Sequence, residues 1–335
     1  MRLHWTRLVS PLLVVMWTAS LSGCVFISAA INPFGQRPEP LQEHVVSGEG
    51  KDKILLLDIS HVISADEQQG TFGLQRREST VANVEEQLQQ AAKDDRVKAI
   101  VLRVDSPGGT VTASDIIYHR LMEFKDQQHL PIIAHFGDVA TSGAYYVSLA
   151  ADEIIASPTS VTGSIGVVMA GINVEGLMSK LGVSNQTIKS GAHKDIGSPL
   201  RKMTAEESAI LQHVLDEMHA RFAGLVRERR PQFAASDKVD EFTDGRIVTA
   251  GQALDAKLVD RIGYLDDAIA DARGRAQLSQ ARVVMYRRPG DFAENIYSQS
   301  VARTDGLQVN LVNLDLGVFL PSQPGLLYLW MPGGY

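Results

Sequence analysis

A serine stands between small residues in the stretch Thr141-Ser142-Gly143-Ala144, after an apolar segment that favours a strand and before one that favours a helix. At a strand-to-helix turn, backbone N–H groups and the helix dipole favour negative charge close to the serine hydroxyl. A nucleophile of acyl transfer needs this arrangement. A serine that only caps the helix N-terminus also suits the position, so the stretch alone leaves both interpretations open.

The segment Ser106-Pro107-Gly108-Gly109 follows a second apolar stretch, Ala99–Val104, which favours a strand. Pro and Gly permit tight turns and a close approach of the backbone to a ligand. The segment is either an ordinary strand-to-helix connection or a loop whose Gly109 N–H forms half of an oxyanion hole.

A third segment, Lys189–Pro199, is a Gly- and Ser-containing loop that carries lysines. A lysine in such a loop is usually a solvated surface charge. It can act as a base only when it is neutral, and a free lysine has a pKa of about 10.4. A lysine base would therefore need a buried, apolar site, since full burial lowers a lysine pKa by up to ~3–5 units.

Four stretches, taken in chain order, resemble the short-form signal peptide peptidase A family. They are Ser106–Gly109, Thr141–Ala144, Thr162-Gly163-Ser164-Ile165-Gly166-Val167 and Lys189–Pro199. The resemblance extends from about Lys53 to Asp267. Members of that family are membrane-anchored serine peptidases with a Ser–Lys dyad. The resemblance implies an α/β fold of the Clp-protease/crotonase type, a βαβ superhelix with a mostly parallel sheet.

The resemblance also implies a role for each matching residue. Ser142 matches the nucleophile and Lys194 the general base. Ser164 matches a hydroxyl that helps to hold the lysine, and the N–H groups of Gly109 and Gly143 match the oxyanion hole. A Clp-type protease would carry a histidine shortly after its serine, whereas residues 144–180 contain none.

Two consequences for partners follow from the resemblance. The substrates are expected to be apolar peptides such as remnant signal peptides, with no cofactor or metal. Short-form members assemble as rings, so we expect a homo-oligomer in which Ser142 and Lys194 come from neighbouring subunits. The Lys189–Pro199 loop has no apolar period that would force it onto its own Ser142.

Two other function classes stay open at this point. A crotonase-like acyl-CoA enzyme shares the Gly-rich oxyanion hole but works without a nucleophilic serine, so it would tolerate Ser142→Ala. An inactive scaffold that binds membrane peptides is the other alternative, and it would not react with a fluorophosphonate probe.

The N-terminus has the features of a secretory signal. Arg2 and Arg7 precede the apolar run Leu12–Trp17, and Leu21-Ser22-Gly23-Cys24 resembles a bacterial lipobox, in which the cysteine is lipidated. Cys24 is therefore the expected lipid attachment site. The alternative is an uncleaved membrane anchor. Both place the body outside the cytoplasm, in the periplasm or an equivalent compartment, because the arginines stay inside.

Composition limits the possible partners. The 335 residues are 44% hydrophobic, enough for a sizeable core, and the net charge is −7. No basic run suggests nucleic-acid binding, so we expect none. A long helix is expected from a capping box at Thr204 to about Arg230, with an apolar residue at every fourth position.

Strand and helix signals alternate along the chain, which indicates parallel strands with right-handed crossovers. Residues 1–31 are expected to be the anchor, 32–50 a flexible tether, 51–277 the peptidase domain and 278–335 an extension of unclear role. Further expected strands are Ile54–Ile59, Pro131–Phe136, Glu153–Ala156 and Gly166–Ala170, with a strand-like Asn185–Ile188. Further expected helices are Val81–Lys93, Thr112–Phe124, Ser142–Ala150, Glu175–Leu181 and Asp267–Ala276.

Overall fold

The computed structural model describes residues 39–69, 76–289, 291, 294–298 and 326–330. All the elements below belong to one compact unit, Pro40–Tyr335. The expected anchor at residues 1–31 and Cys24 lie outside the described residues. Within the described part, no helix has both the length and the apolar character needed to cross a bilayer.

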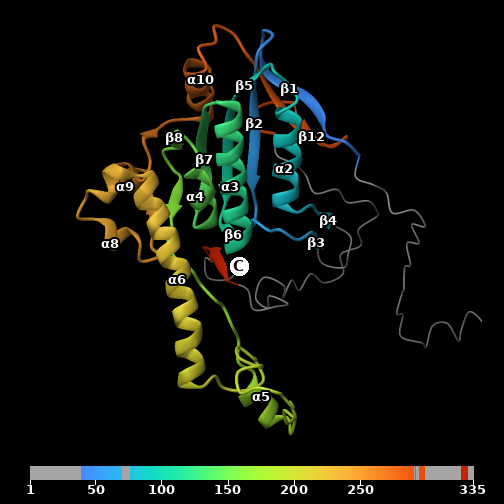
Figure 1. Ribbon diagram of the computed structural model, residues 1–335, viewed down its shortest axis with the longest axis vertical. Helices are drawn as coiled ribbons and strands as arrows, with labels where there is room; N and C mark the ends of the chain where they lie inside the picture. Colours follow the sequence, from blue (N-terminus) through green and yellow to red (C-terminus); the bar gives the residue numbers. More distant parts are fainter. Residues whose placement is uncertain (1–38, 70–75, 290, 292–293, 299–325, 331–335) are drawn as a thin grey trace, which may run out of the picture. The chain divides into compact units, whose positions relative to one another are not determined.

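A mostly parallel sheet lies at the centre of this unit (Figure 1). Its strands follow the order β1-β12-β2-β5-β7-β8-β11, while β9 pairs with β7 and β10 with β9. The β1–β12 and β10–β9 pairs are antiparallel, and the others are parallel. This confirms the predicted α/β class. The strands of this sheet are β1 (Gln42–Gly48), β2 (Lys53–Ser60), β5 (Val97–Ser106), β7 (Ile132–Thr141), β8 (Glu153–Ala156), β9 (Val161–Gly163), β10 (Ile247–Thr249), β11 (Arg261–Ile262) and β12 (Arg282–Arg287).

The central strands are apolar along their length because helices cover both faces of the sheet. On β2, Leu55 and Leu57 belong to one core layer, and Ile54 and Leu56 belong to the other. This alternation follows from the two-residue period of a strand.

Helices α2, α3, α4, α6 and α9 contribute to the first layer, and α10 contributes to the second. The helices are α2 (Thr80–Ala91), α3 (Val111–Gln128), α4 (Gly143–Ser148), α5 (Glu175–Lys180), α6 (Ala205–Arg229), α7 (Pro231–Ala234), α8 (Val239–Phe242), α9 (Ala250–Asp255) and α10 (Leu265–Arg275). Among the described residues, four short strands lie outside the central sheet: β3 (Gln68–Gln69) pairs with β4 (Arg76–Arg77), and β6 (Gly108–Thr110) pairs with β13 (Leu327–Leu329).

The structure corrects the expected domain limits of 51–277 at both ends. Residues 42–48, predicted to be part of a flexible tether, form edge strand β1, and β12 from the predicted extension lies between β1 and β2. Val46 and Val283 are buried in the second core layer, which explains why both segments join the sheet.

Two predicted strands are absent where they were expected. Residues 166–170 contain only an isolated bridge, at Val168, and residues 185–188 are irregular with Ile188 99% exposed. A segment that favours a strand becomes one only when a neighbouring strand supplies hydrogen-bond partners, and the central sheet offers none to these two segments.

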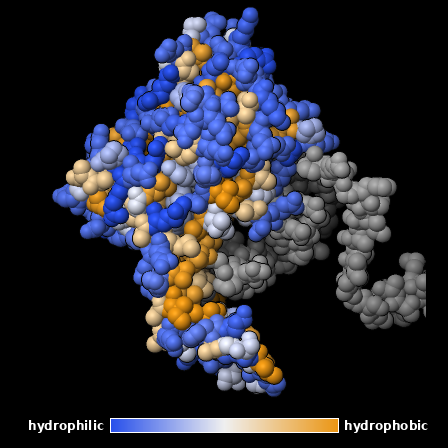
Figure 2. Space-filling model, in the orientation of Figure 1, coloured by the Kyte–Doolittle hydropathy of each residue, from blue (hydrophilic) through white to orange (hydrophobic). Residues whose placement is uncertain are grey.

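Helix α6 is confirmed, and Thr204 and Glu207 form the predicted capping box. Its apolar stripe, however, is only partly buried. Phe222 and Val226 are fully buried, whereas Ile210 is 40% exposed. Figure 1 shows the N-terminal part of α6 leaving the sheet together with α5, and Figure 2 shows hydrophobic side chains exposed along it.

A buried ion cluster joins three strands of the sheet. Asp58 on β2 lies opposite Arg103 on β5, whose Nε and Nη2 donate to the two carboxylate oxygens at 2.6 Å each. Arg287, at the end of β12, also bonds to Asp58. All three side chains are at most 10% exposed.

We predict that Asp58→Asn lowers the free energy of unfolding by about 3–5 kcal/mol, because two buried guanidinium groups lose their carboxylate. Urea denaturation followed by far-UV circular dichroism measures this. Glu67→Gln, at an exposed position, is the control. A loss of less than about 1 kcal/mol for Asp58→Asn would contradict the structural importance of the cluster.

Candidate active site

Ser142 occupies a strained turn between β7 and α4. Its φ of 55° and ψ of −117° are rare for a residue other than glycine. Its N–H donates to the Gly163 carbonyl at 2.8 Å, and its carbonyl accepts from the Tyr146 N–H at 2.9 Å. The side chain makes no capping hydrogen bond. The hydroxyl is thus left available, as it is for the serine at the strand-turn-helix motif of α/β-hydrolases.

The turn is supported from two sides by the tyrosines that follow Ser142. The Tyr145 hydroxyl donates to the Leu258 carbonyl at 2.7 Å, and the Tyr146 hydroxyl donates to Asp115 at 2.6 Å. Burial raises the pKa of both phenols, so they stay neutral donors at ordinary pH. These bonds hold α4 in place beneath the serine.

Ser164 lies at the same end of the sheet as Ser142. Strand β9 pairs with β7 so that Gly163 lies opposite Thr141. Ser142 directly follows β7, and Ser164 directly follows β9. Ser164 also has a positive φ, 51°, and is 8% exposed. The structure therefore brings these two predicted residues together.

Gly109 and Gly143 approach each other closely through their backbones. A Cβ on Gly109 would lie 1.9 Å from the Ile63 carbonyl oxygen, so no larger residue fits there. A Cβ on Gly143 would lie 2.4 Å from the Ser114 hydroxyl and 3.1 Å from the Gly109 nitrogen. The two predicted oxyanion-hole amides thus lie together, next to Ser142.

Lys194 is not part of this cluster within one chain. It is exposed, and no hydrogen bond joins its amine to Ser142 or to any other described residue. Lys194 belongs to the segment that joins α5 to α6, and Figure 1 shows α5 near the end of α6 that lies away from the sheet. One chain therefore presents four of the five predicted active-site residues together and the fifth apart.

The loop that carries Lys194 is tied to the start of α6. Asp195 accepts from Lys189 at 2.6 Å and from the Arg201 Nη2 at 2.6 Å, and Arg201 also reaches Glu207 at 2.6 Å. Arg201 holds the pKa of Asp195 well below its usual range and lowers that of Glu207 to about 2. Glu207 in turn caps the helix through the Thr204 N–H at 3.0 Å.

One feature of the site escaped the sequence analysis. Strand β13 pairs with β6, so that Tyr328 lies opposite Gly109 (Figure 1). Its signal, the short apolar run Leu326–Trp330 between Pro–Gly and Met–Pro, is present in the sequence. Its partner is more than 200 residues earlier in the chain, and no local pattern identifies so distant a pairing.

Comparison with known proteins agrees with this geometry. Residues 124–279 match the model of peptidase family S49. A protein of Enterococcus faecium named for signal peptide peptidase SppA is 34% identical over 282 residues, which cover 84% of this chain and 80% of that protein. A protein of Methanocaldococcus jannaschii named as a protease is 35% identical over 71% of this chain and 75% of its own length.

The chain belongs to peptidase family S49. It is a serine endopeptidase, which decides against the acyl-CoA enzyme and the inactive scaffold. A chloroplastic serine protease SPPA of Arabidopsis thaliana is 31% identical over 64% of this chain and 32% of its own. Among solved structures, the match with a membrane-bound stomatin-specific protease covers 68% of this chain and 87% of that protein's chain. Its TM-score is 0.42 and the sequence identity is 16%.

We predict that Arg201→Met frees the lysine loop of this S49 peptidase from α6 and increases its cleavage by trypsin at Lys189 and Lys194. Lys202→Met, next in the chain and exposed, is the control. The ion network should persist at neutral pH and weaken as the pH falls from about 4 towards 2, because the folded-state pKa values are depressed. Equal protection of the loop in both variants would contradict this role.

Proposed function

We propose that this S49 peptidase hydrolyses apolar peptides, including remnant signal peptides, with Ser142 as nucleophile and Lys194 of a neighbouring chain as general base. One observation carries the proposal. Ser142, Ser164, Gly109 and Gly143 are brought together on a rigid framework, whereas Lys194 is presented on an exposed loop away from them.

The proposed reaction proceeds through an acyl-enzyme. A neutral Lys194 amine takes the Ser142 proton as Oγ attacks the peptide carbonyl carbon. The Gly109 and Gly143 N–H groups stabilise the oxyanion. The lysine then gives the proton to the departing amine as the C–N bond breaks. Water, deprotonated by the same lysine, hydrolyses the ester and restores the serine. The Ser164 hydroxyl orients the lysine.

The chemistry requires that Lys194 be covered by another surface. A lysine is a base only when neutral, and burial favours the neutral amine. The lysine loop is exposed in one chain. A neighbouring subunit that packs onto the loop would both bury the amine and supply the serine, so we propose a homo-oligomeric ring on a Clp-protease/crotonase-like superhelix.

The surface near the loop suits such a neighbour. Large hydrophobic side chains are exposed on α5, on the segment after it and on the adjoining part of α6 (Figure 2). They are Leu177, Leu181, Val183, Ile188, Met203 and Ile210. A hollow of about 310 Å³ opens beside them. It is lined by Met169, Ile172, Met203, Leu211 and Leu215 among others. Contiguous exposed apolar surface of this kind marks interaction sites.

We predict that Ser142→Ala and Lys194→Ala each lower kcat/KM for an apolar peptide by about 10⁴-fold or more. His193→Ala is the matched control for the loop, and Ser148→Ala, at the last residue of α4, is the control for the serine. Both controls should keep most of the activity, since His193 is exposed and the Ser148 hydroxyl only donates to the Ala144 carbonyl.

Mixing the two inactive variants tests whether the site is shared. If each site draws serine and lysine from adjacent subunits, random mixed rings contain both groups at about a quarter of the sites. Activity should recover towards that fraction after the chains are dissociated and reassembled together. Mixed rings that stay as inactive as either parent would contradict a shared site while leaving the dyad itself intact.

We also propose that Cys24 is lipidated and tethers the peptidase to a membrane outside the cytoplasm, on the evidence of the charged start, the apolar run and Leu-Ser-Gly-Cys. Mass spectrometry of the mature chain from a bacterial host should find a diacylglyceryl group on an N-terminal Cys24. Cys24→Ala should abolish it. Recovery of an intact Met1–Arg7 peptide from the mature wild-type protein would support an uncleaved anchor instead.

A further inference from the structure

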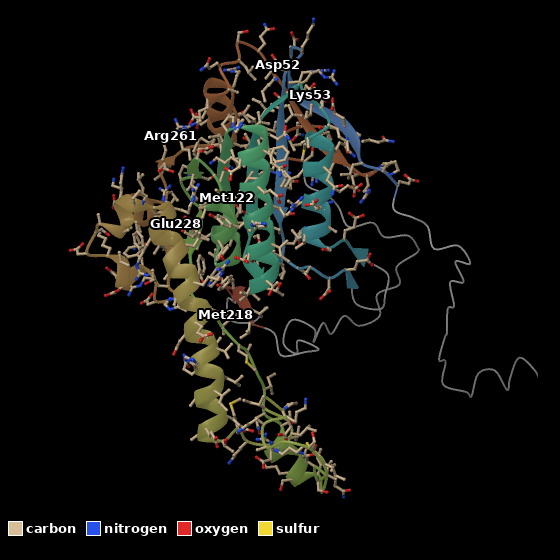
Figure 3. All side chains as sticks on the ribbon, in the orientation of Figure 1. Asp52, Lys53, Met122, Met218, Glu228 and Arg261 are labelled. Atoms are coloured by element: carbon tan, nitrogen blue, oxygen red, sulfur yellow. The ribbon has the colours of Figure 1, made fainter. Side chains whose placement is uncertain are left out.

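Helix α6 is packed against the rest of the chain by its C-terminal half only. Phe222, Ala223 and Val226 are buried there. Of the described side chains, those of residues 205–217 add none to either core layer. Figure 3 marks Met218 where α6 leaves the sheet and its covering helices, and Glu228 near its C-terminal end. The unpacked part is about 20 Å long, since a helix rises about 1.5 Å per residue, and it begins at the loop that carries Lys194.

An ion pair in the packed half of α6 joins three helices. Arg221 on α6 donates to Asp115 Oδ1 on α3, from Nη2 at 2.6 Å and from Nε at 3.2 Å. The same oxygen accepts from the Tyr146 hydroxyl at 2.6 Å. Tyr146 belongs to α4, the helix that starts directly after Ser142. Arg221 therefore ties α6 to the support of the nucleophile in its own chain.

Two further contacts beside Arg221 hold the packed half of α6. The ring of Phe222 lies 5.0 Å from that of Tyr146. His219 Nε2 lies 2.6 Å from the Thr243 carbonyl oxygen, and because a carbonyl only accepts, the imidazole is the donor. Apolar packing keeps the helices together but has no preferred direction. The direction in which α6 points is therefore set by these hydrogen bonds and the ion pair.

We propose that Arg221 is a positioning residue for the base: through Asp115 it fixes the direction of α6, and so the point that Lys194 reaches in the neighbouring subunit's site. This rests on the proposed function of Ser142 and Lys194. A tilt of about 10° at Arg221 would move the first residue of α6 by about 4 Å. A misplacement of about 1 Å can lower a rate by about 10²-fold.

The exposure of the ion pair makes this role separable from folding. The Arg221 side chain is 63% exposed and that of Asp115 is 34% exposed. Ion pairs so open to water add little to stability. Arg221→Met should therefore unfold at the same urea concentration as the wild type, and the Tyr146–Asp115 bond should still support α4.

Mixed rings assign the effect of Arg221→Met to one subunit. A Lys194→Ala chain supplies only the serine, and a Ser142→Ala chain supplies only the lysine. In the lysine-supplying chain, Arg221→Met should lower kcat of the mixed rings by about 10-fold or more at unchanged KM. In the serine-supplying chain it should lower kcat by less than about 3-fold, because Tyr146 keeps its bond to Asp115.

Two variants of the lysine-supplying chain serve as comparisons. Arg221→Lys keeps a cation beside Asp115 and should restore most of the lost kcat. Arg227→Met removes an exposed arginine of the same helix that has no ion pair in the described part of the chain, and it should leave kcat unchanged.

The other results would overturn the inference. A loss confined to the serine-supplying chain would mean that Arg221 acts on its own Ser142. An equal loss in both chains, or rings that fail to form in analytical ultracentrifugation, would make Arg221 a structural residue only. Active mixed rings that are indifferent to Arg221→Met would overturn this inference alone. Mixed rings that are inactive with Arg221 intact would overturn the shared site of the proposed function, and the inference with it.

Discussion

The close approach of two glycine backbones is the constraint on which the active site depends. Gly109 lies against the Ile63 carbonyl and Gly143 against the Ser114 hydroxyl and the Gly109 nitrogen, with no room for a Cβ on either. That approach places two N–H groups side by side at the turn that strains Ser142. The strain is tolerated because buried strands β7 and β9 and the bonded tyrosines of α4 fix the turn on both sides.

The two halves of the proposed dyad have opposite physical requirements. A serine nucleophile needs preorganisation, which the parallel sheet supplies through short backbone contacts within one chain. A lysine base needs desolvation, and an exposed loop cannot provide it alone. The Arg201 network fixes the shape of the loop without burying the lysine. In the proposed function, assembly is then the step that turns on the base, and an isolated chain would not cut peptides indiscriminately.

The sequence predicts much of the fold and of the site, for identifiable reasons. The strands over β2, β5, β7 and β8 are apolar runs that a doubly covered sheet requires, and Ser142, Ser164, Gly109 and Gly143 lie at turns with characteristic neighbours. Strands β1 and β12 were missed because their segments are partly polar, and only their pairing partners make them strands. The same limitation affected the predicted strand at residues 166–170, where Val168 pairs only with Leu327 among the described residues. The position of Lys194 away from Ser142 depends on the course of the loop, on which local patterns carry no information.

The central claim is that one chain holds a preorganised serine that acquires its base only on assembly. The rate at which a fluorophosphonate labels Ser142, followed by mass spectrometry over a wide range of protein concentration, measures this directly. We expect the rate per chain to rise in step with the oligomeric fraction determined by analytical ultracentrifugation. We expect Lys194→Ala to stay at the low, monomeric rate at every concentration. Rapid labelling of dilute, monomeric wild-type protein would contradict the account.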